Sequence, residues 1–563
     1  MNTWRRRGLV MATALLAGMA SMQAGAHDPG NPGNGPVVRT NEGWVRGEVV
    51  DGVARYLGIP YAAPPVGRLR WQPPQPAANW HHVRDATEYG NICAQVTTLG
   101  VFAGPASVDE DCLYLNVFTT RQGHSGSGNG RRPVLVWIHG GGNVDGASND
   151  YDGSKLATGG PLGVDTVVVT TNYRLGLFGF LSHPALDTEG HAFGNYGILD
   201  LQAVLRWVQR NIDSFGGDPN NVALGGQSAG AQDTAANMIS PLATGLFHRA
   251  ILQSSPTATL APLSIARTRG GNFATAAGCP GTGAAAAVCL RALSPQEILA
   301  LQGTANSNGP YVNGPMVDGT VIPLSPEQAW STGNFNRVPV MGGNVLDEAN
   351  FGIGITEYFT GPPQRAMDAS DFTRLVTATY SGPSGPGGTA PNYPDGTVAS
   401  VLARYPLSSY KTVQRAYDDL VTDAGACRTL HVLKLLAPWV PTYGYQFDYR
   451  DAPYYFPAMP NFEPLAAHTI DIQFLFPLWR GGILGVAHPL NPAETLLSDQ
   501  LVAAWTQFAR TGNPNGTGSA PWPRFAGANP MFLSQNVGGL STYGADHYAE
   551  MHQCSFWDTI LRY

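Results

Sequence analysis

Short apolar runs alternate with segments of helical spacing through the middle of the chain. Residues Pro133–Gly140 (PVLVWIHG) and Asp165–Tyr173 (DTVVVTTNY) are apolar and rich in β-branched side chains, a pattern typical of strands buried on both faces. Ile198–Ile212 has apolar residues at helical spacing, and it is followed by a short strand-like run, Asn221–Leu224, and a small-residue-rich helix, Ala229–Ser240. This order predicts an α/β protein with a mostly parallel sheet flanked by helices. Binding sites in such sheets lie at the carboxyl ends of the strands.

Two glycine-rich stretches interrupt this pattern, Gln122–Gly130 and Ser381–Gly396. Both are typical of surface loops rather than domain boundaries, and the sequence contains no internal repeat. Hydrophobic residues make up 43% of the 563 residues and charged residues 13%, so the chain can bury a large core. We expect a single domain over residues 27–563, after a leader of residues 1–26.

The N-terminus has the pattern of a secretion signal. A basic segment, MNTWRRR, precedes an apolar stretch that is too short to span a bilayer, and the small residues Ala24–Ala26 predict cleavage after Ala26. Such a leader is typical of bacterial export, so we expect a periplasmic or secreted protein with no stable membrane anchor. Arg6 and Arg7 also permit the twin-arginine route, and the choice of route stays open.

Charge and cysteine content narrow the function classes further. The formal net charge is −7, and the leader contains Arg5, Arg6 and Arg7 and no acid, so the mature chain carries −10. No long basic run remains, which argues against nucleic acid as a partner. Six cysteines in an exported chain favour disulfides over metal ligands, and no CxxC motif occurs. Proximity in the sequence suggests Cys93–Cys112 and Cys279–Cys289, which leaves Cys427–Cys554.

The motif GQSAG, Gly226–Gly230, places Ser228 between a predicted strand and a predicted helix. A serine on such a turn projects its hydroxyl away from the sheet at a cost in backbone strain, and the glycines leave room for the neighbouring strand and helix. The helix N-terminus favours developing negative charge. The alternative is a hydroxyl in an ordinary glycine-rich turn, but the strand–turn–helix context favours a nucleophile.

A second glycine turn, His139–Gly142, directly follows the predicted strand of PVLVWI. Consecutive glycines let several backbone N–H groups point into one small volume, where acyl transfer requires donors for the tetrahedral oxyanion. By itself this is equally well a tight turn. In combination with GQSAG it predicts an oxyanion hole formed by Gly141, Gly142 and Ala229.

A serine hydroxyl requires a base, and an α/β-hydrolase order of serine, acid and histidine places that base well downstream. The downstream histidine candidates are His431, His468, His488, His547 and His552. His468 leads because it precedes a hydrophobic segment, whereas His488 lies in a proline-flanked loop. The acid candidates are Asp347 and Glu348, after the strand-like run Val338–Gly343, and the pattern does not separate them.

With these motifs in this order, the sequence resembles the type B carboxylesterases, in the carboxylesterase/cholinesterase branch of the α/β-hydrolases. The resemblance covers almost all of the mature chain, and it rests on segments in family order: YLGIPYAAPPVGRLRW, EDCLYLNVF, WIHGGG, NYRLGLFGFL, NIDSFGGDPNNVALGGQSAGA, FHRAILQSS, NVLDEANF and AAHTIDIQFLF. It implies an α/β-hydrolase fold with long gorge-forming loops. It also implies Ser228, Glu348 and His468 as the catalytic triad, the same three disulfides, and a serine, Ser254, that supports the acid in some members.

The resemblance implies an exported serine hydrolase that cleaves a small-molecule carboxylic ester through an acyl-enzyme on Ser228, with no cofactor and no metal. Two departures argue against a choline ester. Gln227 stands where cholinesterases carry glutamate, and the loop between Cys93 and Cys112 contains no tryptophan for a cation–π contact. The alternatives are an esterase or lipase specialised for a bulky natural or xenobiotic ester, and a cholinesterase-like adhesion protein without catalysis.

Overall fold

The computed structural model describes residues 35–561, apart from 103, 121–129, 188, 192–193, 256–259, 307–313, 383–392, 460 and 517–520. The expected leader and nearly all of the glycine-rich stretch Gln122–Gly130 lie outside the described residues, as does most of Ser381–Gly396. Contacts within the chain join residues Pro36–Tyr563 into one compact unit.

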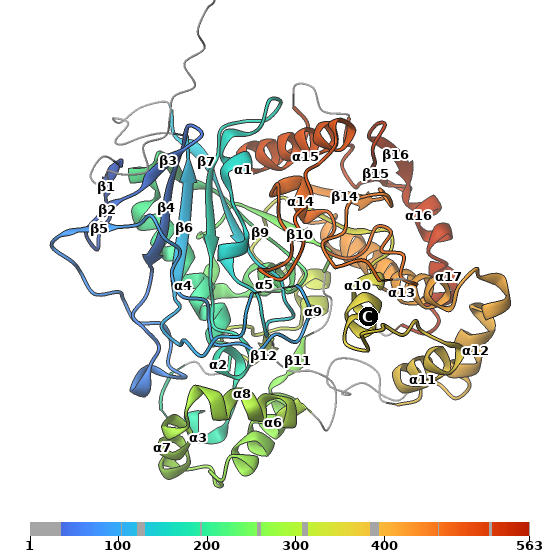
Figure 1. Cartoon of the computed structure of the whole chain (residues 1–563), viewed down its shortest axis with the longest axis horizontal. Coiled ribbons are helices and arrows are strands. Elements are labelled where there is room, and N and C mark those ends of the chain that lie inside the picture. Colours follow the sequence, from blue (N-terminus) through green and yellow to red (C-terminus); the bar gives the residue numbers. More distant parts are fainter. Residues whose placement is uncertain are drawn as a thin grey trace, which may run out of the picture. The chain divides into compact units, whose positions relative to one another are not determined.

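A large mixed sheet forms the centre of this unit (Figure 1). Seven neighbouring strands, from β15 to β8, run parallel, and the pairs at the two edges are antiparallel. In spatial order the described strands of this sheet are β16 (Ser541–Gly544), β15 (Met531–Gln535), β14 (Thr442–Phe447), β13 (Val340–Val345), β10 (Arg249–Gln253), β9 (Gly217–Gln227), β7 (Arg132–Ile138), β8 (Val167–Thr171), β6 (Tyr114–Thr119), β4 (Val53–Pro60) and β3 (Glu48–Val50). The mostly parallel α/β architecture expected from the sequence is confirmed.

Helices surround the sheet, and the described residues also form a three-stranded and a two-stranded sheet. The helices are α1 (Ser154–Thr158), α2 (Gly176–Phe180), α3 (Pro184–Asp187), α4 (Tyr196–Asn211), α5 (Ala229–Ile239), α6 (Leu263–Ala276), α7 (Ala284–Ala292), α8 (Pro295–Asn306), α9 (Pro326–Thr332), α10 (Asn350–Tyr358), α11 (Ala369–Tyr380), α12 (Thr397–Arg404), α13 (Val413–Leu436), α14 (Ile472–Leu475), α15 (Pro492–Thr511), α16 (Ala545–Met551) and α17 (Cys554–Trp557). The smaller sheets are formed by β1 (Val37–Arg39), β2 (Trp44–Arg46) and β5 (Val83–Asp85), and by β11 (Ala261–Pro262) and β12 (Met316–Val317).

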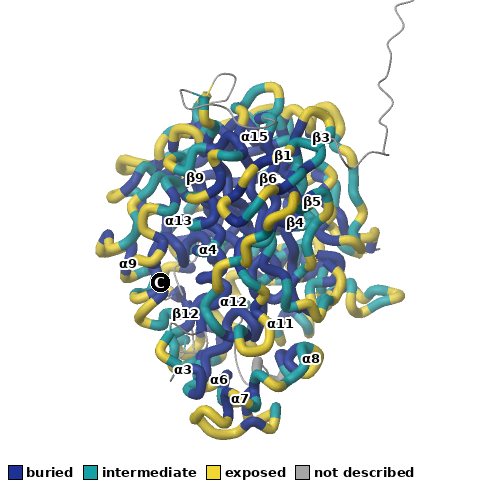
Figure 2. Tube along the Cα trace, turned by 90° about the vertical axis from the view of Figure 1, so that its left-hand side faces the viewer, coloured by how far each residue is buried: buried dark blue, intermediate teal, exposed yellow. Residues whose placement is uncertain are grey.

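Strand β7 shows why its sequence is apolar at every position from Pro133 to Ile138. Val134, Val136 and Ile138 pack in one buried cluster together with residues of α4 and α5. Leu135 and Trp137 point to the opposite face and pack in a second cluster with residues of α15. The tube in Figure 2 shows this buried interior in dark blue beneath an exposed periphery.

Strand β9 is longer than the sequence pattern predicted. The expected strand Asn221–Leu224 extends to Gly217–Gln227 and therefore includes both glycines before Gln227. The prediction stopped early because glycine is disfavoured in strands, but here Gly225 and Gly226 pair with β7 and β10 on the two sides. The strand consequently ends at the residue just before Ser228.

The structure contains three disulfides, Cys93–Cys112, Cys279–Cys289 and Cys427–Cys554. Because such bonds persist in oxidising compartments, they indicate an extracellular or secreted protein. Within the described part of the chain no single helix is long and apolar enough to cross a membrane, and α7 with the first part of α8 meets that test only as a pair bent by 101°.

Candidate active site

Ser228 occupies the turn between β9 and α5 in a conformation that side chains rarely adopt. Its backbone has φ 57° and ψ −122°. Hydrogen bonds hold this conformation: the Ser228 N–H donates to Gln253 O at 2.8 Å, and its carbonyl accepts from Ala231 N and Gln232 N. A non-glycine residue at positive φ is strained, so the surrounding sheet and helix must maintain the turn.

Gly226 and Gly230 allow three elements to meet at this turn. A Cβ atom on Gly230 would lie 2.1 Å from Ile138 O at the end of β7, and one on Gly226 would lie 2.5 Å from the Gly230 backbone. Both distances are far below van der Waals contact. The motif therefore requires glycine on both sides of Ser228 for packing, in addition to any role in chemistry.

The glycine turn after β7 lies against the Ser228 turn. A Cβ atom on Gly140 would lie 3.1 Å from the Ser228 Cβ atom, and Gly141 and Gly142 have φ of 114° and 61°. The N–H groups of Gly141, Gly142 and Ala229 donate to no acceptor within the described part of the chain. Ala229 is the first residue of α5, where an N–H has no intrahelical partner. These three donors therefore have no protein partner among the described residues.

His468 lies within hydrogen-bond reach of both Glu348 and Gln227. Its Nδ1 contacts Glu348 Oε2, and its Nε2 lies 3.1 Å from the amide nitrogen of Gln227. When the imidazole is neutral, Nδ1–H donates to the carboxylate, so Nε2 carries the lone pair and accepts from Gln227. No hydrogen bond joins His468 to the Ser228 hydroxyl among the described residues; the imidazole engages the residue next to the serine instead.

The electrostatics around His468 favour its protonated form. Burial by itself lowers the pKa of His468, but the charge and hydrogen bond of Glu348 and the charge of Asp471 outweigh it and raise the pKa above its usual value. Glu348 is held in turn by the Val345 N–H, which donates to its Oε1 at 3.0 Å.

The two acids that the sequence pattern left open have different surroundings. Asp347 is fully buried and accepts hydrogen bonds from Arg415 and Arg450 at 2.6–2.8 Å, whereas Glu348 reaches His468. The Arg415 and Arg450 guanidinium groups hold the pKa of Asp347 below its usual value, although burial opposes them. Asp347 therefore belongs to a structural ion-pair network.

A profile of the Carboxylesterase family matches residues 34–557 of the chain. The chain belongs to the carboxylesterase family. It is 34% identical to Carboxylesterase 1E of Mus musculus over 98% of each chain, and 35% identical to Cocaine esterase of Oryctolagus cuniculus over 87% of this chain and 90% of that one. Among solved structures it is similar to a thermophilic PNB esterase, with a TM-score of 0.73 and 28% identity over 92% of this chain and 99% of the other. The protein is accordingly a carboxylic ester hydrolase with the α/β-hydrolase fold.

The other histidine candidates in this carboxylesterase lie apart from the Ser228 turn. His431 is on α13 beside an acid of α9, and His552 is buried with its Nδ1 2.9 Å from Asp423 Oδ1. His547 is exposed on α16, and His488 lies in an irregular segment before α15. The structure thus brings only one of the five candidates to the residue preceding Ser228.

Asp471 is a charged neighbour of the His468–Glu348 pair that the sequence patterns did not assign. It accepts a hydrogen bond from Gln253 Nε2 at 2.8 Å, and burial together with the Glu348 charge raises its pKa to about 7. The sequence signal that could have identified Asp471 is its position in HTID, three residues after His468. Ser254, which the resemblance associates with the acid, has a buried hydroxyl with no hydrogen-bond partner among the described residues.

Two other features of the carboxylesterase are poor candidates for a binding site. A hollow of about 280 Å³ is lined by polar residues of β1 and of the segment before β9, at the opposite end of β9 from Ser228. Asp347, Asp418 and Asp419 have oxygen atoms within 4.8 Å of one another, but Arg415 already forms ion pairs with all three.

Proposed function

We propose that this carboxylesterase hydrolyses esters through an acyl-enzyme on Ser228, with His468 as the base and Glu348 as the acid. The observation that supports the proposal most is the 3.1 Å contact between His468 Nε2 and the side chain of Gln227, the residue directly before the strained Ser228. When substrate binds, Nε2 exchanges the Gln227 amide for the Ser228 hydroxyl. Glu348 then stabilises the imidazolium.

The proposed reaction proceeds in two halves. Ser228 Oγ attacks the ester carbonyl while His468 takes its proton, and the carbonyl oxygen becomes an oxyanion bound by the N–H groups of Gly141, Gly142 and Ala229. The C–O bond to the alcohol then breaks, and His468 donates its proton to the leaving oxygen. Water activated by His468 hydrolyses the acyl-enzyme and restores the serine. The scheme requires no metal or cofactor.

The proposal extends to the substrate and the location of the enzyme. The neutral Gln227 beside His468 supports a small uncharged ester rather than a choline ester. The basic and apolar leader, together with the three disulfides, supports export with cleavage after Ala26 and a single mature domain over residues 27–563. We propose no nucleic-acid partner and no membrane anchor.

Covalent labelling tests the mechanism. An alkyl phosphonate is expected to modify Ser228 stoichiometrically, as measured by mass spectrometry of the peptide, and Ser228→Ala is expected to lower kcat for p-nitrophenyl butyrate by at least about 10⁴-fold. Ser214→Ala, in the segment before β9, is the matched control and should retain wild-type kcat. A Ser228→Ala variant with full activity, or an inactivated enzyme labelled elsewhere, would show that the mechanism is wrong.

A further inference from the structure

The loop closed by the Cys93–Cys112 disulfide is hydrogen-bonded to the residues just after the glycine turn. Thr98 donates twice to Asp145 Oδ2, from its N–H at 2.9 Å and from its hydroxyl at 3.0 Å. Gln95 pairs with the backbone of Gly146: its Oε1 accepts from the N–H at 2.9 Å, and its Nε2 donates to the carbonyl at 3.1 Å. Four hydrogen bonds therefore join this loop to two consecutive residues.

Asp145 belongs to the same turn as the proposed oxyanion donors. The N–H groups of Val144 and Asp145 both donate to Gly141 O, at 3.0 and 3.1 Å. A Cβ atom on Gly141 would lie 1.8 Å from Asp145 O, which shows how closely the two ends of the turn approach each other. A displacement of Asp145 is therefore transmitted directly to Gly141 and Gly142.

The Asp145 carboxyl is buried, and Thr98 supplies its side-chain partner. Burial raises the pKa of Asp145 to about 7, while hydrogen bonds from Thr98 and from the Leu99 backbone lower it. Its other oxygen, Oδ1, has no hydrogen-bond partner among the described residues. Because a buried polar group is costly without hydrogen-bond partners, the two hydrogen bonds from Thr98 restrain this carboxyl group.

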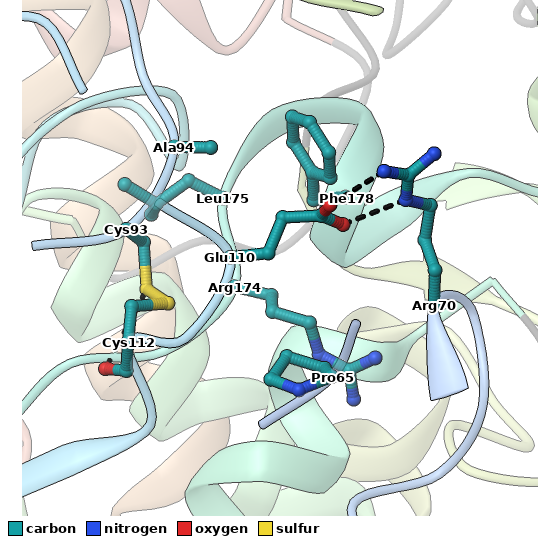
Figure 3. A pocket seen from close by; sticks show the side chains of 9 residues that line it. All are labelled: Pro65, Arg70, Cys93, Ala94, Glu110, Cys112, Arg174, Leu175 and Phe178. Carbon is teal, nitrogen blue, oxygen red and sulfur yellow. Dashed lines mark hydrogen bonds and ion pairs between the residues drawn. A yellow bond between two sulfur atoms is a disulfide. The ribbon is translucent and has the colours of Figure 1, made fainter. Parts of the chain in front are cut away.

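The disulfide loop is itself anchored to the fold. Glu110, two residues before Cys112, forms a two-bond ion pair with Arg70 at 2.5 and 2.7 Å, and both side chains are buried. Figure 3 shows this pair beside the Cys93–Cys112 disulfide. The cavity between them measures about 10 Å³, which is too small for an ester and consistent with a structural role. Because the loop is fixed to the rest of the fold, its hydrogen bonds can restrain the glycine turn.

The same loop also contacts the aromatic side chains next to the histidine. The Phe102 ring centroid lies 5.3 Å from that of Phe351, and the Phe351 ring lies 5.5 Å from the His468 ring. The loop thus contacts the proposed oxyanion side of the site directly and the histidine side through one phenylalanine.

We infer that Thr98 and Gln95 are positioning residues for acyl transfer: through Asp145 and Gly146 they fix the glycine turn in the geometry that binds the oxyanion. This inference rests on the proposed function of Gly141 and Gly142. Neither residue touches the reacting atoms. Their loss is expected to weaken binding of the transition state and to leave binding of the substrate nearly unchanged.

Thr98→Val tests the inference, because it removes one hydroxyl from an exposed residue and conserves shape. We expect kcat for p-nitrophenyl butyrate to fall about tenfold with KM unchanged within about twofold. The Ser228 hydroxyl adds to the carbonyl of a trifluoromethyl ketone, and the carbonyl oxygen becomes an oxyanion. Affinity for this ketone should fall by a similar factor, whereas affinity for the matching methyl ketone should not change. Thr98→Ser should restore kcat, and Gln95→Met should act in the same direction as Thr98→Val.

Thr97→Val is the matched control, because the Thr97 hydroxyl donates to Gly104 O within the loop. It should retain wild-type values. Wild-type kcat and ketone affinity in Thr98→Val would overturn the inference, and so would an equal loss of affinity for both ketones. Phosphonate labelling separates the two proposals: an unlabelled Ser228 in the wild-type enzyme refutes the proposed function, whereas a labelled Ser228 with an unaffected Thr98→Val refutes the positioning role alone.

Discussion

At the scale of single residues, the amide of Gln227 is a neutral neighbour of His468, whereas Glu348 and Asp471 are acids. The amide donates to Nε2 from a distance of 3.1 Å, while Glu348 contacts Nδ1 and the charge of Asp471 acts on the same ring. The imidazole therefore has two acids among its neighbours and a neutral amide from the residue directly before the serine. A negative charge at position 227, in addition to that of Glu348, would change both the pKa of His468 and the charge preference of the site.

Gln227→Glu is expected to raise the pKa of His468 further, because a carboxylate favours the imidazolium. The acidic limb of the kcat/KM profile should move to higher pH, since a higher pH is then needed to form the neutral base. The ratio of kcat/KM for acetylcholine to that for its neutral isostere 3,3-dimethylbutyl acetate should rise about tenfold. Gln227→Met removes the hydrogen bond without adding charge, and it should leave that ratio unchanged. An unshifted acidic limb in Gln227→Glu would contradict this account.

At the scale of elements, the glycines of the GQSAG motif are needed for the packing of strands and helix as well as for the proposed chemistry. Strand β7, strand β9 and helix α5 approach one another at Gly226 and Gly230, where any Cβ atom would meet backbone at 2.1–2.5 Å. Backbone atoms in a sheet cannot move aside as a flexible side chain can. The position of Ser228 relative to the glycine turn consequently depends on the absence of side chains at positions 226 and 230.

Gly230→Ala is expected to push α5 away from β7, because its Cβ atom would overlap Ile138 O. The free energy of unfolding should fall by about 1–3 kcal/mol and kcat should fall with it. Gly271→Ala is the matched control: Gly271 lies inside α6 with nothing within 4 Å of its Cβ position. That variant should gain up to about 1 kcal/mol. Chemical denaturation and steady-state kinetics check both, and an equally stable, fully active Gly230→Ala would contradict the packing argument.

At the scale of the whole molecule, the fold encloses several acids that pair poorly with cations. Burial is the largest cause of raised pKa values in five carboxyl groups, to about 7 in four and to about 8 in Asp233; the five are Asp145, Asp150, Asp233, Asp448 and Asp471. In the unfolded chain these groups are ionised near neutral pH. The folded state therefore binds more protons than the unfolded state above about pH 4, and stability falls with rising pH until the folded groups have ionised at about pH 7 to 8.

Thermal unfolding is expected to show this dependence between pH 6.5 and 8.5. Two other shifted groups act below this window. Burial lowers the pKa of His139 to about 4, and hydrogen bonds from Arg365 lower the pKa of Asp371. We expect Tm to fall on the order of 5 °C across the window. Asp448→Asn should reduce the slope, whereas Asp371→Asn should not. A Tm that rises with pH in this window would contradict the assignment of neutral buried acids.

Much of the fold and part of the site follow from local patterns. Strands β7 and β8 and helices α4 and α5 match their predicted positions within a few residues, because burial on both faces and helical spacing leave clear periodicities. The end of β9 was missed, because its glycines pair in the sheet against their local preference. The turn at Ser228 was recognisable, since a strand, two glycines and a helix start are adjacent in the sequence.

The sequence by itself determined the alternation of strands and helices, the strained turn at Ser228 and the adjacent glycine turn, because each depends on backbone preferences within a few residues. The local pattern left Asp347 and Glu348 open and the resemblance implied Glu348, and the tertiary structure shows that Glu348 contacts His468. Only the tertiary structure decided that Gln227 engages the other nitrogen and that Thr98 restrains Asp145. These contacts join residues 120, 241 and 47 positions apart. Local periodicity carries no information about such pairs, which form only when the sheet brings the ends of different strands together.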